Sequence, residues 1–175
     1  LHRQILDREG FPDVPILERR RWVTEHADWA RQALLLEPRG HRDMYGAVLL
    51  PPHDPDADVA VLFMHNAGYS TMCGHGIIAL TTGLIEEGLY PATMPVTTIR
   101  WETPAGLVTA RADVAPGEDG GPEVRGVRFT NVPSYLHQSD IGVAVDGCGE
   151  VLVQLAFGGA YYGIVDAADL RLRVV

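Results

Sequence analysis

The chain has 175 residues, of which 46% are hydrophobic, and its formal net charge is −9 at pH 7. This length fits one domain, or one domain and a piece of another, and the composition allows a sizeable core. The acidic balance, without any basic stripe, argues against a nucleic-acid partner, and no apolar run reaches the ~20 residues of a membrane-spanning helix.

Three further absences narrow the class of protein. The sequence contains no lysine, so by itself it cannot form the Schiff base of a pyridoxal phosphate enzyme or complete a P-loop. Its two cysteines do not make a disulfide framework, which favours a reducing cytoplasm. No basic and apolar leader opens the chain, so we expect no signal peptide.

The first predicted element is an amphipathic helix over residues 18–36, which ends before Pro38 because the residue preceding proline disfavours helical dihedral angles. Trp22 and Trp29 lie on one face of this helix, and core packing is the simplest interpretation of that face. The basic run at residues 19–21 is expected on a solvated face. The turn at residues 41–43 (His-Arg-Asp) is either a hydrogen-bonded turn or part of a pocket rim.

Two buried strands follow, at residues 45–50 and 59–64, because both are uninterrupted apolar runs between turn residues. A tight connection at residues 66–71 leads to a helix that begins near Cys73 and ends at Gly88, a glycine suited to ending a helix. Apolar residues cover most of the circumference of this helix, so we expect neighbours on nearly all sides. Either Ser70 or Thr71 is expected to cap its start.

The rest of the chain is rich in strands. Residues 96–101 and 107–112 predict a hairpin, and the glycine- and proline-rich, acidic stretch 113–123 predicts a linker. Short strands follow at 127–132, 141–145, 151–157 and 160–165, the last two forming a hairpin. The sequence therefore predicts an α+β domain over residues 1–122, with one strongly buried helix, and the first strands of a second domain over residues 123–175.

The stretch Cys73-Gly74-His75-Gly76 holds the strongest candidate site. The start of a helix leaves backbone N–H groups unpaired and binds anions, and this position also stabilises a thiolate. Each glycine costs about 1 kcal/mol of helix propensity relative to alanine, so two in one turn suggest that a ligand must approach the backbone. A thiolate beside a carboxylate-sized anion pocket can remove a proton α to a carboxylate.

Other interpretations of this stretch stay open at this point. Cys73 is a buried structural cysteine with packing glycines in the simplest one. His65, Cys73 and His75 are a weak zinc set, because no second pair with ligand spacing occurs. The His75 side chain is a candidate acid near neutral pH, against the alternative that only its backbone N–H matters. "GYSTM" is not a nucleophile elbow, since Met72 replaces the final glycine.

Four segments, in this order and at these distances, resemble the proline racemase superfamily, which includes proline racemase, 4-hydroxyproline 2-epimerase and trans-3-hydroxy-L-proline dehydratase. They are "EPRGHRDMYGA" (37–47), "NAGYSTMCGHGIIAL" (66–80), "ETPAGLV" (102–108) and "RFTNVPSYL" (128–136). The pair Ser70-Thr71 makes the second segment look most like the dehydratase branch. The resemblance implies a proline racemase/diaminopimelate epimerase-like fold, in which each of two similar units wraps a sheet around a central helix.

The resemblance also implies a mechanism without a cofactor or metal. Cys73 would be the base that takes the α-proton of proline or a hydroxyproline, and the amides of Gly74 and His75 would hold the substrate carboxylate. In a racemase a second cysteine faces the first, whereas in the dehydratase a threonine stands there and the 3-hydroxyl leaves.

The sequence departs from the family pattern at that second catalytic segment, which does not occur in these residues. Cys148, in a glycine-flanked turn, is interpreted as a turn or core thiol and not as the second catalytic cysteine. We therefore expect this chain to hold half of an active site. The alternative outside the class of enzymes is a truncated, non-catalytic fragment that binds a small carboxylate. The protein partner that we expect is a second copy of the chain, in a homodimer paired through an exposed sheet edge of the second domain.

Overall fold

A computed structural model of the chain describes residues 10–118 and 120–173. These residues divide into two compact units, Leu1–Asn131 and Val132–Val175, and each unit is described by itself. No helix in the described ranges combines the length and hydrophobicity that crossing a membrane requires.

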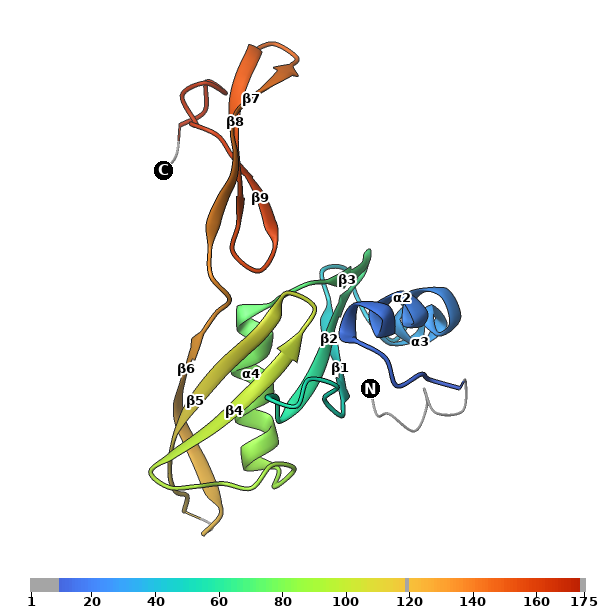
Figure 1. The fold of residues 1–175 in the computed structure, drawn as a ribbon, viewed down its shortest axis with the longest axis vertical. Coiled ribbons are helices and arrows are strands. Elements are labelled where there is room, and N and C mark those ends of the chain that lie inside the picture. The colour runs from blue at the N-terminus through green and yellow to red at the C-terminus, as the bar shows by residue number, and fades with distance from the viewer. Residues whose placement is uncertain (1–9, 119, 174–175) are drawn as a thin grey trace. The chain divides into compact units, whose positions relative to one another are not determined.

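The first unit is built on a six-stranded sheet with the strand order β1-β2-β4-β5-β6, and β3 also pairs with β2 (Figure 1). The strands are β1 (Tyr45–Leu50), β2 (Val59–His65), β3 (Gly68–Ser70), β4 (Val96–Thr103), β5 (Gly106–Pro116) and β6 (Pro122–Thr130). All pairs are antiparallel except β2 with β4, which run parallel and pair only at Val59–Trp101 and Ala60–Glu102. The predicted strands at 45–50 and 59–64 and the predicted hairpin are confirmed.

Strand β2 is buried on both faces, which explains its uninterrupted apolar sequence. Leu62 and Met64 belong to the cluster formed with the two N-terminal helices. Phe63, on the other face, is fully buried beside the helix that follows Cys73. One strand therefore links the packing of the N-terminal helices to the packing of the candidate site.

The predicted helix at 18–36 is two helices, α2 (Ile16–His26) and α3 (Asp28–Leu35). Ala27, with φ −131°, interrupts them because a change of axis there lets Val23, Ala27 and Leu35 all reach the core. The expectation of a solvated face at residues 19–21 is wrong for Arg19, which is buried, pairs with Asp13 and donates to the Pro51 carbonyl over 2.7 Å.

The helix predicted from Cys73 to Gly88 is confirmed as α4 (Gly74–Glu86), but its cap differs from the expectation. Cys73 occupies the N-cap position, while Ser70 ends β3, a strand within the stretch predicted as a plain connection. The helix is also less enclosed than expected. It buries one face (Ile77, Thr81, Leu84 and Ile85), against strands that include β5 and β6, whereas Ile78 and Ala79 are exposed.

The stretch 113–123, predicted as a linker, is the end of a hairpin. Strand β5 runs to Pro116 and β6 starts at Pro122, and these two prolines are paired. Gly120, with φ +83°, lies in the turn between them, a backbone conformation that glycine adopts without strain. Glycine and proline thus mark a turn within the sheet here, and the chain leaves this unit only after Asn131.

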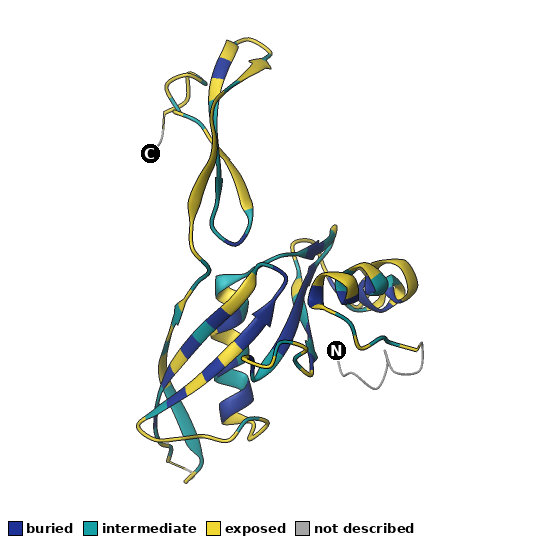
Figure 2. Ribbon diagram, in the orientation of Figure 1, coloured by how far each residue is buried: buried dark blue, intermediate teal, exposed yellow. Residues whose placement is uncertain are grey.

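The second unit is an antiparallel sheet of β7 (Tyr135–Val145), β8 (Gly149–Phe157) and β9 (Tyr161–Ile164), in that order. It confirms the predicted hairpin around residues 158–159. Figure 2 shows how little of this unit is buried. Val151 is its only buried hydrophobic side chain among the described residues, whereas Tyr161, Tyr162 and Ile164 on β9 are all exposed.

Candidate active site

Cys73 is placed by the short β3 strand before it and by α4 after it. Its half-buried thiol Sγ accepts a hydrogen bond from the Gly76 amide over 3.3 Å, and its carbonyl accepts from the Ile77 amide over 3.0 Å. The amides of Gly74 and His75, which lie between Cys73 and these two donors in the sequence, have no acceptor within the described residues. Two N–H groups at a helix start, with a sulfur beside them, can bind a small anion such as a carboxylate.

At this helix start, Cys73, His75 and Gly76 line a pocket of about 550 Å³, which falls in the usual range for small-molecule sites. Its walls are mostly apolar: Tyr45, Gly46, Ala47, Phe63, Cys73, His75, Gly76, Ala79 and Leu80. The pocket lies over β1, β2 and the first two turns of α4. A small ring could lie on its apolar walls with its acid group at the helix start.

The two glycines of the first turn also lie against neighbours that the sequence did not indicate. A Cβ on Gly76 would lie 2.7 Å from Cε1 of Phe63, which is fully buried, and a Cβ on Gly74 would lie 2.9 Å from Cζ of Phe129. The close neighbours in the structure are therefore two phenylalanine rings of the same chain. The glycines let the helix start approach the sheet.

A second polar group lies on the pocket side of β1. The Tyr45 and Ser70 hydroxyls are hydrogen-bonded, and the Tyr45 ring stacks on His65 with 5.8 Å between ring centroids. Tyr45 and His65 are direct partners in the β1–β2 register, where cross-strand side chains meet. Tyr45 is not predictable as a site residue from the sequence, because only the pairing of the strands brings it to the pocket that Cys73 lines.

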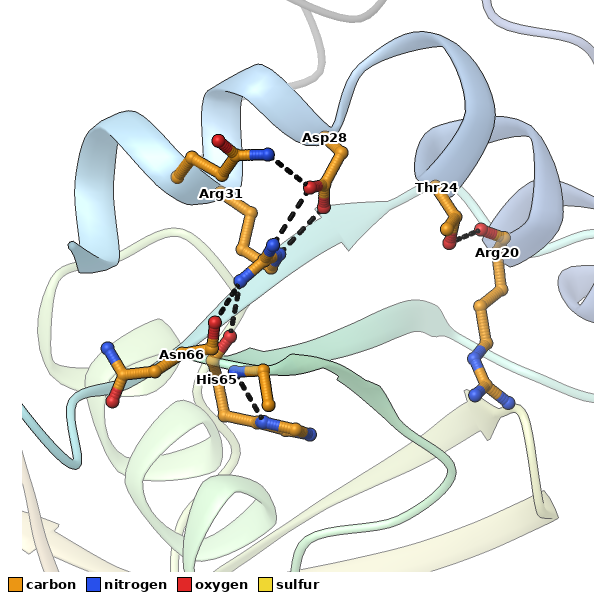
Figure 3. Close-up of polar contacts among 8 residues, drawn as sticks. Arg20, Thr24, Asp28, Arg31, His65 and Asn66 are labelled. Atoms are coloured by element: carbon orange, nitrogen blue, oxygen red, sulfur yellow. Dashed lines mark hydrogen bonds and ion pairs between the residues drawn. The ribbon is translucent and has the colours of Figure 1, made fainter.

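A network of hydrogen bonds made by Arg31 holds this end of β2 against α3 (Figure 3). The sequence did not indicate this network. The buried guanidinium of Arg31 donates to both carboxylate oxygens of Asp28, over 2.7 and 2.8 Å, and to the carbonyl oxygens of His65 and Asn66. The hydrogen bonds from Arg31 lower the pKa of Asp28 to about 2. Burial first, and the Asp28 charge second, raise the pKa of the nearby Tyr69. We call Arg31 and Asp28 the Arg31 clamp.

The remaining residues selected from the sequence lie outside the pocket. Within the turn at residues 41–43, the exposed His41 ring bonds the Arg42 carbonyl over 2.7 Å, as in the hydrogen-bonded alternative. Cys148 belongs to the second unit, where its thiol donates to the Leu170 carbonyl over 3.7 Å. The zinc set is not assembled, since no group of three His, Cys, Asp or Glu in the described residues could hold a metal ion.

The comparisons with known proteins all indicate one family. The family model described as "Proline racemase" matches residues 8–175. A trans-L-3-hydroxyproline dehydratase of Xenopus tropicalis is 48% identical over 160 residues, which are 91% of this chain and 44% of that protein. A 3-hydroxyproline 2-epimerase of Burkholderia multivorans is 46% identical over 94% of this chain and 49% of that protein. The chain thus spans about half the length of the curated relatives it matches.

The solved structures agree with this assignment. A hydroxyproline epimerase from Agrobacterium vitis, with bound trans-4-hydroxy-L-proline, superposes with a TM-score of 0.81 at 33% identity, covering 93% of this chain and 47% of that one. A probable proline racemase from Agrobacterium radiobacter, with bound carbonate, superposes equally well. The predicted fold and the resemblance on which it depended are confirmed.

Proposed function

The chain belongs to the proline racemase family, and from that premise we propose that it supplies the first half of the active site of a trans-3-hydroxy-L-proline dehydratase. The observation that carries the proposal is the start of α4, where Cys73 and His75 line one pocket and the Gly74 and His75 amides have no acceptor within the described residues. The names of two similar relatives, a 3-hydroxyproline dehydratase and a 3-hydroxyproline 2-epimerase, support a hydroxyproline as the substrate.

In the proposed reaction, the substrate carboxylate accepts hydrogen bonds from the Gly74 and His75 amides. The Cys73 thiolate takes the proton from Cα. Negative charge then spreads from Cα onto the carboxylate oxygens, where the two amides and the positive end of the helix dipole stabilise it more strongly than in the ground state. No cofactor is required for this step.

Proton removal is followed by loss of the 3-hydroxyl. The electron pair of the Cα–H bond forms the double bond to C3 as the C3–O bond breaks, and the product after tautomerisation is a pyrroline carboxylate and water. Proline racemisation or hydroxyproline 2-epimerisation is the alternative, and it needs a second acid that returns a proton to the opposite face of Cα. A cysteine at the opposing position favours that alternative, and a threonine favours dehydration.

The rest of the proposal concerns the whole protein. The second unit, Val132–Val175, is the beginning of a second domain, and the protein is cytoplasmic. It acts on a free amino acid, and the protein partner we propose is a second copy of the chain in a homodimer. The rival from another class is a fragment that binds a small carboxylate without turnover. Calorimetry with pyrrole-2-carboxylate, a planar mimic of the deprotonated ring, measures the binding that both the enzyme and this rival require.

Replacing Cys73 tests the proposal directly. In the complete protein, Cys73→Ser is expected to lower turnover of trans-3-hydroxy-L-proline by about 10⁴-fold or more, because the base is lost. Product analysis by chiral chromatography separates the reactions: a pyrroline carboxylate indicates dehydration, and an inverted amino acid indicates epimerisation. A C73S variant with full activity would refute the role of Cys73.

A further inference from the structure

Loss of a hydroxyl group as hydroxide is unfavourable, so the proposed dehydration needs an acid that protonates the departing oxygen. Of the nine residues that line the pocket, only Tyr45, Cys73 and His75 have side chains that can donate a proton. Cys73 acts as the base at this stage. Within this half of the active site, the choice of acid is therefore between the Tyr45 phenol and the His75 ring.

The structure holds the Tyr45 side chain at both its ring and its hydroxyl. The ring stacks on His65, and the hydroxyl is hydrogen-bonded to Ser70. His65 is itself fixed: its Nδ1 accepts from the Ala67 amide over 3.2 Å, and its carbonyl accepts from the Arg31 clamp (Figure 3). Tyr45 and His75 are both exposed, but the His75 ring has no hydrogen-bond partner among the described residues. Acids positioned in advance are the more effective ones.

We propose that the Tyr45 phenol is the catalytic acid that protonates the departing 3-hydroxyl, and that Ser70 is its positioning residue. This inference rests on the proposed function. It adds a step that racemisation does not need, because racemisation leaves the ring substituents untouched.

The step balances without another reactant. The α-proton moves to the Cys73 sulfur, and the Cα–H electron pair becomes the new carbon–carbon double bond. The C3–O bond breaks, and its oxygen leaves as water with the Tyr45 proton. The phenolate that remains accepts a hydrogen bond from the Ser70 hydroxyl and is reprotonated at the expense of the Cys73 thiol through solvent, so no oxidation state changes.

The test separates proton removal from dehydration in the complete protein. In deuterium oxide, NMR follows exchange of the substrate α-proton, and chromatography follows the pyrroline carboxylate. Tyr45→Phe keeps the stacked ring, so it should keep α-exchange while dehydration falls by about 10²-fold or more. Ser70→Ala should lower dehydration by a smaller factor. An analogue with chloride in place of the 3-hydroxyl needs no acid, and Y45F should convert it at the wild-type rate.

Tyr90→Phe is the matched control, because Tyr90 follows the opposite end of α4 and its hydroxyl donates to the Thr98 carbonyl. Y90F should dehydrate at the wild-type rate. If Y45F dehydrates at the wild-type rate, the inference about Tyr45 is overturned and the proposed function is not. The same holds if Y45F loses α-exchange or elimination of chloride. Selective loss of dehydration in His75→Gln but not in Y45F overturns it in favour of His75. A wild-type protein that neither exchanges nor dehydrates, or a C73S variant that does both, overturns the proposed function as well.

Discussion

On one face of β2, Leu62 and Met64 are buried against the helices α2 and α3, and the Arg31 clamp ties the end of the strand to α3. On the other face, Phe63 reaches the pocket that Cys73 opens onto. The first face is closed by side chains and by an ion pair between the buried Arg31 and the half-buried Asp28. The second face borders a cavity, and beside it two amides at the start of α4 have no acceptor within the described residues.

This difference indicates a division of tasks across a single strand. The clamped face supplies the rigidity that a site needs to keep its geometry, and the pocket face leaves polar groups available for a ligand. Changes on the clamped face should therefore alter mainly the free energy of unfolding. Changes on the pocket face should alter mainly the reaction. Four substitutions test this comparison, in decreasing order of their expected effect on stability.

The largest effect is expected at the buried end of the clamp. Arg31→Met keeps an unbranched side chain but leaves Asp28 and the carbonyls of His65 and Asn66 without their donor. Removing one partner of a buried pair is strongly destabilising, so we expect a loss of about 3 kcal/mol in the free energy of unfolding, measured by urea denaturation. Arg21→Met, on an exposed position of α2, should change it by less than about 0.5 kcal/mol. Equal losses in the two variants would remove the distinction between the faces.

The Asp28 carboxylate of the Arg31 clamp should make the free energy of unfolding depend on pH. The Arg31 hydrogen bonds hold the pKa of Asp28 at about 2, below its ordinary value of 3.8. A depressed pKa stabilises the fold above pH 3.8, and that stabilisation disappears as the pH falls towards 2. At roughly 1.4 kcal/mol per pKa unit, this contribution is about 2 kcal/mol.

Comparison of the wild type with Asp28→Asn measures this contribution. By urea denaturation, D28N should be less stable at about pH 6 and should approach the wild type near pH 2, where the carboxyl is protonated in both states. A gap between the two proteins that stays constant over this range would show that the ion pair is not its source.

The third substitution tests the pocket face at its tightest contact. Gly76→Ala would force a Cβ against the Phe63 ring, which costs about 1–3 kcal/mol in a well-packed core and exceeds the gain of about 1 kcal/mol in helix propensity. We expect a net loss of about 1 kcal/mol. Turnover should also fall, because the first turn of α4 must shift. Thermal unfolding and steady-state rates give the two quantities.

The smallest effect is expected at a glycine of the same helix that has no such neighbour. A Cβ on Gly83 would meet nothing within 4 Å, so Gly83→Ala should raise the free energy of unfolding by about 0.5–1 kcal/mol. It should leave turnover unchanged. A G83A variant that is destabilised like G76A would show that the Phe63 contact is not what distinguishes the two positions.

The local elements could be predicted from the sequence because their patterns lie within a few residues. Strands β1 and β2 are apolar runs between turns, and β4 and β5 meet across a short turn, so their existence followed from spacing alone. Helix α4 was placed correctly, and the expected position of Cys73 at its start is confirmed. The assignments of Cys73 as base and of Gly74 and His75 as carboxylate ligands stay predictions.

The errors arose where distant residues decide the outcome. Phe63 and Phe129 lie where a Cβ on Gly76 or Gly74 would be, and the sequence did not indicate these contacts. The Arg31 clamp joins atoms 34 residues apart. Its bidentate pair with Asp28, spaced by three residues on one helix, was visible in the sequence, but its carbonyl partners were not. Likewise the break at Ala27 depends on which side chains the sheet can bury, and no helical periodicity contains that information.

The N-cap bond between the Cys73 sulfur and the Gly76 amide has a consequence for the timing of catalysis. A negatively charged acceptor forms a stronger hydrogen bond than a neutral one. If Cys73 is the base, capture of the α-proton weakens the bond that begins α4, just as the carbanion comes to depend on the neighbouring amides. The hydrogen bond at the start of α4 would then weaken and strengthen once in every turnover, as the Cys73 sulfur gains and loses its proton.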